Sequence, residues 1–198
     1  AAIEQLCRTA IEHAVHGVCV NGSNVLQAYT LLEDHGVRVV AVVGFPLGAM
    51  ETDVKRYETE TAVDSDAHEI EVVLNIGRLK ENDHAYVLRE LRDICEAADE
   101  RPVNVVIEAD LLTPEEQKLA CDLILDSGAR ALSTHTGLFG KPNASLIRRL
   151  RGYLGTKFLL KATPVADLNT ALEIIECGAN RVGLLAGPTM SLVEFTRK

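Results

Sequence analysis

The sequence predicts an α/β fold in which strands and helices alternate within one domain, residues 1–198. Short β-branched runs recur along the chain, and each is followed by a stretch with helical periodicity. The runs are continuously apolar, as expected of parallel strands that are covered on both faces. A repeated unit of this kind is typical of a (β/α)-barrel or of an open, doubly wound sheet.

The pattern places strands and helices in order along the chain. The expected strands are 18–21, 37–43, 69–75, 103–108, 129–134, 157–162 and 180–184. The expected helices are 2–14, 23–35, 50–65, 82–98, 114–127, 143–153, 166–177 and 189–197. Thr113-Pro114 is a helix start signal, because threonine caps a helix and proline suits its first position. The chain opens with a helix, so a closed barrel of eight strands would lack its first strand, which either precedes Ala1 or is absent from an incomplete barrel.

Composition and charge exclude several classes of protein. With 198 residues and 47% apolar side chains, the chain is long enough for one well-buried domain. A net charge of −9 and only 4% aromatic residues argue against a nucleic-acid partner. No apolar run is long enough for a membrane span, and no signal peptide is visible. Five scattered cysteines without CxxC spacing indicate reduced thiols in a cytoplasmic protein, without disulfides or a zinc site.

Chemistry is expected at the carboxyl ends of the strands, where barrel enzymes keep their active sites. The predicted ends are Asn21, 44–48, 75–77, 108–110, 133–137, 161–164 and 183–187. One of them, L-S-T-H-T-G at 132–137, offers a serine and a histidine but no lysine or carboxylate. This end can support hydrogen bonding and proton transfer, and it cannot support an imine.

Six stretches, which together span nearly the whole chain, carry a resemblance to a known family. They are GVCVNGSNV (17–25), VVAVVGFPLGAMETDVKRYETETAV (39–63), HEIEVVLNIGRLKEND (68–83), VVIEADLLTPEE (105–116), THTGLFG (134–140) and TALEIIECGANRVG (170–183). In order and spacing they resemble the deoxyribose-phosphate aldolase family, with VVGFPLG and the NIG at 75–77 as the most specific motifs. The resemblance implies a TIM (β/α)8 barrel whose first strand is missing from this chain. It also implies class I aldol chemistry, in which a lysine amine forms a Schiff base with a carbonyl donor.

The chain departs from the family at the positions that carry this chemistry. The family's sixth strand ends V-K-T-S-T-G, so the same register puts Ser133 where the Schiff-base lysine belongs. Glu71 occupies the position of an aspartate that handles protons, and Asn104 that of a lysine on the fifth strand. Lys161 matches the family's second active-site lysine, on the seventh strand. A divergent member lacking the Schiff-base lysine is therefore implied, and any covalent step has moved to Lys161.

The segment that resembles the family's phosphate site has lost its hydroxyls. The family's G-T-S-S-G reads G-L-L-A-G here, from Gly183 to Gly187, and Pro164 removes an amide from the neighbouring turn. Backbone amides of this glycine-flanked turn can still hold an anion. We therefore expect a small carbonyl substrate other than deoxyribose 5-phosphate, bound in a more apolar pocket.

Lys161 and Glu71 are the leading catalytic candidates. A Schiff base needs a neutral amine, hence a pKa below the usual value of about 10.4, whereas a nearby carboxylate raises that pKa. Lys161 is thus expected to form the imine, to act as an ammonium that polarises or binds a substrate group, or to make a structural ion pair. Glu71 should face the barrel interior, where it pairs with Lys161 or serves as a general base. Glu69, two residues earlier on the same face, is the structural alternative.

His135 and Ser133 share a strand face because they are two residues apart. His135 is expected to act as an acid or base, or as a donor to the substrate, because its pKa lies near neutrality. Ser133 lacks a nucleophile elbow, so a hydrogen-bonding role is favoured over a nucleophilic one. The further substrate-binding candidates are Asn21, Asn75, Asn104, Gly137, Lys141, Gly183 and Gly187.

Three functions remain open from the sequence. The first is an aldolase-like lyase in which Lys161 forms an imine or polarises a carbonyl. The second is a non-covalent isomerase, cyclase or dehydratase that uses Glu71, His135 and Lys161. The third is an inactive barrel that binds a small molecule or a partner subunit. Polar groups clustered at the mouth favour an enzyme, for which we expect no cofactor or metal, no nucleic-acid or membrane partner, and assembly into a homo-oligomer, a dimer.

Overall fold

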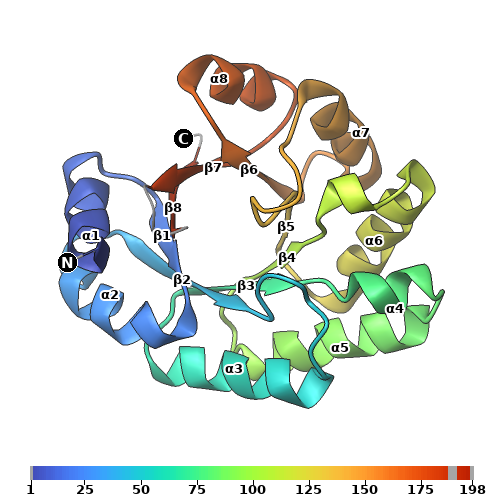
Figure 1. Ribbon diagram of the computed structural model, residues 1–198, viewed down its shortest axis with the longest axis horizontal. Coiled ribbons are helices and arrows are strands. Elements are labelled where there is room, and N and C mark those ends of the chain that lie inside the picture. Colours follow the sequence, from blue (N-terminus) through green and yellow to red (C-terminus); the bar gives the residue numbers. More distant parts are fainter. Residues whose placement is uncertain (1, 187–190, 197–198) are drawn as a thin grey trace.

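In the described part of the chain, eight strands form a closed barrel surrounded by helices (Figure 1). The structure is a computed structural model that describes residues 2–186 and 191–196, with side chains described as far as Leu184. The strands are β1 (Gly17–Val20), β2 (Arg38–Val43), β3 (Glu69–Val73), β4 (Val103–Val106), β5 (Ala131–Ser133), β6 (Leu159–Val165), β7 (Arg181–Ala186) and β8 (Ser191–Thr196). The helices are α1 (Ala2–Glu12), α2 (Val25–Leu32), α3 (Thr52–Asp64), α4 (Ile76–Lys80), α5 (His84–Ala97), α6 (Pro114–Ser127), α7 (Ala144–Leu154) and α8 (Leu168–Glu176). Two 3-10 turns, η1 (Gly22–Asn24) and η2 (Ala109–Leu111), follow β1 and β4.

The strands follow one another around the barrel in chain order. From β1 to β7, each strand pairs in parallel with the next, so the carboxyl ends of these seven strands meet at one mouth. The helices lie outside the strands as an outer ring, as Figure 1 shows. The predicted α/β fold of the TIM-barrel type is therefore confirmed, and the mouth is where its chemistry is expected.

The predicted helix at 189–197 is wrong, because this segment contains the strand β8. β8 runs antiparallel between β7 and β1, and Glu194 is the register partner of both Gly183 and Gly17. Two open sheet edges would leave rows of backbone N–H and C=O groups unpaired, and only a strand can pair with both of them. β8 thus closes the ring at the place where the sequence predicts a missing strand.

Local capping signals fix where several helices begin. The capping box at the start of α6 is present, because Thr113 Oγ1 accepts from Glu116 N and Glu116 Oε2 accepts from Thr113 N. The short helix α4 is not predicted from the sequence, because five residues are too few to show helical periodicity. Its start cuts β3 short at Val73, and Asn75 becomes its cap instead of the end of the strand.

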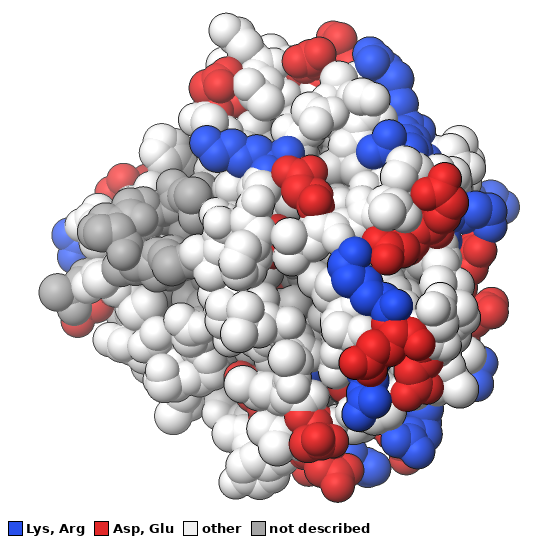
Figure 2. All heavy atoms as spheres, turned by 45° about the vertical axis from the view of Figure 1, so that its right-hand side comes forward, with Lys and Arg blue, Asp and Glu red and all other residues white. Residues whose placement is uncertain are grey.

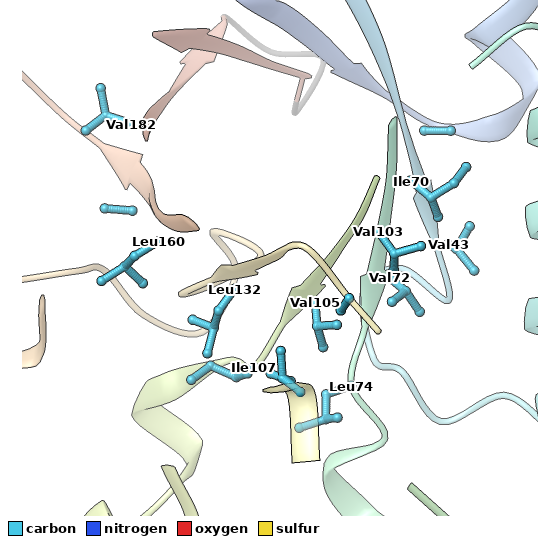
Figure 3. Close-up of a cluster of buried hydrophobic side chains, with 14 of the residues drawn as sticks. Val43, Ile70, Val72, Leu74, Val103, Val105, Ile107, Leu132, Leu160 and Val182 are labelled. Atoms are coloured by element: carbon cyan, nitrogen blue, oxygen red, sulfur yellow. The ribbon is translucent and has the colours of Figure 1, made fainter. Parts of the chain in front are cut away.

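The outward faces of the strands carry the apolar core that joins the barrel to its helices. In Figure 3 the side chains of this core stand on the outer side of the strands, toward the helices. The strand residues that the figure labels are Val43, Ile70, Val72, Val103, Val105, Leu132, Leu160 and Val182, all of them buried. Their burial supplies the apolar driving force that holds the strand register in place.

The inward faces of the same strands are polar over much of the barrel. Side chains alternate between the two faces of a strand, so the residues between the apolar ones point inward. The buried polar residues on the strands are Glu69, Glu71, Asn104, Ser133, Lys161, Thr163 and Arg181. A small apolar cluster of Cys19, Val40 and Val42 lies on the β1–β2 side. Barrel interiors are usually filled with branched aliphatic residues, so this polar interior points to a functional site.

The molecular surface carries both signs of charge in mixed order. Figure 2 shows Lys and Arg side chains interspersed with Asp and Glu on the right-hand part of the face in view, without a region of one sign. Such a surface offers no basic stripe for a phosphate backbone on this face. Among the described residues, no helix has the length and apolar character needed to cross a bilayer.

Gly48→Ala is expected to destabilise the fold by at least about 2 kcal/mol. Gly48 has a φ of +65°, where alanine costs roughly 1–2 kcal/mol, and an added Cβ would lie 2.1 Å from the Leu74 carbonyl oxygen. Gly152→Ala is the matched control, because Gly152 lies inside α7 with open space around an added Cβ. It should stabilise the protein by roughly 0.5–1 kcal/mol. Urea unfolding midpoints of both variants test this, and equal midpoints would contradict the tight contact between the β2–α3 loop and Leu74.

Candidate active site

The strand register brings the predicted catalytic residues together inside the barrel. Ser133 on β5 and Lys161 on β6 are register partners, so their side chains stand side by side. Glu71 lies on β3, where the flanking Ile70 and Val72 pack outward into the apolar core. The interior therefore collects a serine, a lysine and a glutamate that are far apart in the sequence.

Lys161 reaches across the interior to Glu71. Its Nζ atom lies 2.5 Å from Glu71 Oε2, and the two side chains are 0% and 4% exposed. β4 and β5 lie between the strands that carry them, so the ion pair spans the barrel instead of linking neighbours. Moving two charges out of water costs several kcal/mol per ion, and apolar residues of similar volume often give equal stability. An ion pair in this position therefore favours a chemical role over a purely structural one.

Two buried hydroxyl groups flank Lys161 on its own and the neighbouring strand. Ser133 Oγ and Thr163 Oγ1 have no hydrogen-bond partner among the described residues, and both residues are fully buried. A buried polar atom without a partner costs roughly 1–3 kcal/mol. Ser133 is the register partner of Lys161 and Thr163 follows it by two residues on β6, so both hydroxyl groups belong to the part of the barrel from which the Lys161 side chain starts.

His135 lies two residues beyond Ser133, toward the mouth, and is fully buried. Neither ring nitrogen makes a hydrogen bond of good geometry within the described residues, but Nε2 lies 3.5 Å from Asp110 Oδ1, and the Thr163 backbone lies near the ring. Burial lowers the pKa of His135 below its usual 6.5, and the carboxylates of Asp110 and Glu108 oppose this shift without cancelling it. The imidazole is therefore neutral at pH 7, which is the form that accepts a proton.

A second polar cluster lies below this site, on the amino-terminal side of Glu71. Glu69 Oε2 accepts from Arg181 NH1 at 2.7 Å and from Asn104 Nδ2 at 3.1 Å, and Oε1 accepts from His16 Nε2 at 2.9 Å. Burial alone would raise the pKa of Glu69, but the hydrogen bonds from His16 and Arg181 hold that pKa well below its usual range. Asn104, a predicted substrate-binding residue, uses its side-chain amide in this cluster.

The remaining predicted binding residues are spread over the mouth and its rim. Asn21 is exposed and makes no side-chain cap bond to η1, whereas the Asn75 side chain accepts from Arg78 N and so caps α4. Gly137 turns the chain after β5 with a φ of +96°, and Gly183 lies within β7. Gly187 lies outside the described residues.

An apolar cavity of about 480 Å³ lies between α8, β6 and β7. Its wall includes Pro164, Val165 and Leu184, and Lys141 stands at it as an exposed lysine. Val182 also lines it and belongs to the outer apolar core, so this cavity opens on the outer side of the sheet. In the described residues this region is lined mainly by apolar side chains, next to the barrel interior that holds Lys161.

The chain is similar to known aldolases in both sequence and structure. No protein-family model matches it. It is 40% identical, over 96% of its length, to the deoxyribose-phosphate aldolase of Bdellovibrio bacteriovorus, and the match covers 87% of that relative. A solved structure described as an aldolase superposes with a TM-score of 0.87 at 31% identity, over 91% of this chain and 81% of the other. The tetrameric deoxyribose phosphate aldolase of Aeropyrum pernix gives a TM-score of 0.82 at 25% identity, over 89% and 76% of the two chains.

The chain belongs to the deoxyribose-phosphate aldolase family. Its enzyme class is accordingly that of an aldolase-type carbon–carbon lyase. Among the described residues, no group of three or more His, Cys, Asp or Glu side chains is close enough together to hold a metal ion.

The family pattern alone misses part of this aldolase site. Thr163, Asp110 and Arg181 are not singled out by any motif, although Thr163 and Asp110 fall within two of the predicted strand ends. What places Asp110 beside His135 is the meeting of two loops, after β4 and after β5, and spacing along the chain carries no signal for such a contact.

Replacing Glu69 should reveal how strongly the lower cluster supports the site. Glu69→Gln is expected to destabilise the protein by about 1.5–3 kcal/mol at pH 7, because the buried guanidinium of Arg181 loses its charge-assisted hydrogen bond to Glu69. Glu60→Gln is the control, because Glu60 pairs with Arg56 on an exposed helix face, where a pair contributes roughly 0.5 kcal/mol or less.

The same variant predicts a pH dependence with a definite sign. The pKa of Glu69 is depressed in the folded state, so its stabilisation is complete above the unfolded value of about 4.5 and is lost as the pH falls through the lower folded pKa. The difference in unfolding free energy between wild type and Glu69→Gln should therefore shrink below about pH 4.5. Urea unfolding from pH 3 to pH 7 measures it, and a constant difference would contradict the ionised cluster.

Proposed function

We propose that this family member cleaves a small carbonyl compound by an aldol reaction in which Lys161 engages the substrate carbonyl. The observation that carries the proposal is the Lys161 amino group, fully buried inside the barrel and 2.5 Å from the Glu71 carboxylate. The amine of the family's Schiff-base position is absent here, because Ser133 stands there. Ser133 and Lys161 are register partners, so a reactive amine on β6 serves nearly the same part of the interior.

Glu71 offers a route to the neutral amine that an imine requires. A buried ammonium and a buried carboxylate can neutralise each other by moving one proton from Lys161 to Glu71, which removes two charges from a poorly solvated site. The amine then attacks the carbonyl carbon, and the protonated Glu71 returns its proton to the oxygen that leaves as water. The resulting iminium withdraws electrons from the carbon–carbon bond that breaks.

The same geometry also suits a non-covalent variant of this role. If the proton stays on Lys161, the ammonium can donate a hydrogen bond to the carbonyl oxygen and stabilise an enolate. Both variants assign Lys161 to the carbonyl, and they differ only in whether a carbon–nitrogen bond forms.

A substrate without a phosphate group is the second part of the proposal. Leu184 stands where the family pattern has a hydroxyl residue, Pro164 lies in the neighbouring turn, and both line the apolar cavity. Leucine offers no donor, and proline has no backbone N–H. A charge-assisted hydrogen bond contributes roughly 1.5–3 kcal/mol, so each one lost weakens phosphate binding by about tenfold or more.

Reductive trapping tests the role of Lys161. The protein is incubated with acetaldehyde, reduced with sodium borohydride and digested, and the modified lysine is located by mass spectrometry. We expect an ethyl group on Lys161 in the wild type and in the exposed control Lys157→Met, and none at this position in Lys161→Met. Turnover of an aldol substrate should fall by at least about 100-fold in Lys161→Met.

The outcomes separate the two variants of the mechanism. A label on Lys161 establishes the imine, whereas no label together with lost turnover in Lys161→Met establishes the ammonium. Full turnover by Lys161→Met, or a specific label on another buried lysine such as Lys55, would contradict the proposal.

The substrate proposal has its own measurement. The kcat/KM for cleavage of 2-deoxyribose 5-phosphate should be no greater than that for 2-deoxyribose, because the apolar segment gives the phosphate no hydroxyl donors. Aldehyde release, followed with a coupled dehydrogenase, gives both values. A preference of 100-fold or more for the phosphorylated sugar would contradict it.

Assembly and compartment complete the proposal. A homo-oligomer is supported by the tetrameric relative from Aeropyrum pernix, and we keep the dimer as the expected state. The thiols of Cys7, Cys95, Cys121 and Cys177 are free in the described residues, which supports a reducing compartment such as the cytoplasm.

A further inference from the structure

His135 and Asp110 form a contact that depends on the meeting of two loops at the mouth. His135 follows β5, and Asp110 lies in η2, directly after β4. His135 Nε2 lies 3.5 Å from Asp110 Oδ1, with the histidine side chain fully buried and the aspartate side chain about half exposed. In the family pattern the position of His135 is a serine, so the imidazole is a feature of this chain.

The surroundings of Asp110 show that its carboxylate is confined. A Cβ added at Gly140 would lie 2.2 Å from Asp110 Oδ2, so the β5–α7 loop packs directly against this carboxylate. Glu108, two residues earlier, accepts from Thr136 N at 3.0 Å and from the Thr136 hydroxyl, which ties the same two loops together. Gly140 thus packs against Oδ2 of Asp110, while Oδ1 of the same carboxylate faces the His135 ring.

The orientation of the ring follows from the charges around it. A carboxylate only accepts hydrogen bonds, so Asp110 favours the tautomer in which Nε2 carries the hydrogen. Nδ1 then keeps its lone pair and makes no hydrogen bond of good geometry within the described residues, although the Thr163 backbone lies near the ring and raises the pKa of His135. This leaves one basic nitrogen, on a neutral and buried imidazole, for a ligand in the mouth.

His135 also lies at the right level relative to Lys161. Ser133 is the register partner of Lys161, and His135 lies two residues further along the chain toward the mouth, about 6–7 Å for an extended chain. The Thr134 hydroxyl donates to the Thr163 carbonyl oxygen, which keeps the two chain segments together beyond the end of β5. A carbonyl held by Lys161 therefore places the outer part of the substrate near His135.

We propose that His135 is the catalytic base that removes the proton from the β-hydroxyl group of the aldol substrate, and that Asp110 is a positioning residue for its ring. The inference rests on the proposed function and names its missing base. The hydroxyl proton moves to His135 Nδ1, the C–O bond becomes a carbonyl, and the bond between the α- and β-carbons breaks. The electron pair enters the iminium or carbonyl at Lys161, and the α-carbon later takes up a proton while the imidazolium loses its own to water, so protons and electrons balance.

Two reactions with unphosphorylated probes separate His135 from Lys161. Exchange of the α-hydrogens of acetaldehyde in D₂O needs the carbonyl group to be activated and involves no β-hydroxyl. Cleavage of 3-hydroxybutanal into two molecules of acetaldehyde needs both steps. His135→Asn should lower cleavage by about 100- to 10,000-fold and leave exchange within about twofold of the wild type.

Matched variants guard against a folding defect. His135→Gln should behave like His135→Asn, and the exposed His35→Asn should leave both reactions unchanged. Retained exchange in the His135 variants itself shows that the barrel and Lys161 are intact. If cleavage and exchange fall together, if cleavage survives in both His135 variants, or if the wild type exchanges but does not cleave, the assignment of His135 is overturned. If the wild type catalyses neither exchange nor cleavage, the proposed function itself is contradicted, and the role of His135 is contradicted with it.

Asp110 is tested by the pH profile, which a merely structural role would not move. The Asp110 and Glu108 carboxylates both raise the pKa of His135, so Asp110→Asn should lower the pKa measured from the ¹⁵N shifts of the ring. The acidic limb of kcat/KM for 3-hydroxybutanal should move to lower pH by the same amount, because the base must be neutral to act. Asp126→Asn, on the exposed end of α6, is the control. An unchanged ring pKa or an unmoved limb in Asp110→Asn would overturn the positioning role.

Discussion

The ion pair between Lys161 and Glu71 is the constraint on which the rest of the site depends. Two opposite charges lie inside the barrel with side chains only 0% and 4% exposed, and each lowers the free-energy cost of burying the other. The contact requires that β3 and β6 keep their register through the two strands between them, and that register is held by apolar side chains on the outer face. The apolar packing outside the barrel therefore determines the positions of the catalytic side chains inside it.

The barrel divides its two tasks between the two faces of each strand. Outward residues such as Ile70 and Leu132 supply apolar burial, whereas inward residues are free to be polar. The cluster of Glu69, Arg181 and Asn104 satisfies its own charges and forms a fixed floor below the site. Above it, groups with unmet hydrogen-bonding capacity are concentrated at the mouth, which is the arrangement expected where a substrate completes the network.

Most of the parallel part of the fold could be predicted from the sequence, because the apolar runs and the glycine and capping signals are local. The pattern fails for β8, since a six-residue segment takes its conformation from the two sheet edges that it closes. It also fails for α4, whose start depends on the Asn75 cap. Asn104 illustrates the limit for the site: its inward position is predictable, but its use by Glu69 is not.

By itself, the sequence determined the order of strands and helices, the residues on each strand face and the chemical types at the mouth, because alternation and capping act over a few residues. Only the tertiary structure decided which of them meet. Lys161 and Glu71 are 90 positions apart, Arg181 and Glu69 are 112 apart, and His135 meets Asp110 across two loops. These contacts exist because closing the barrel fixes every strand relative to the others, and no short-range pattern encodes that closure.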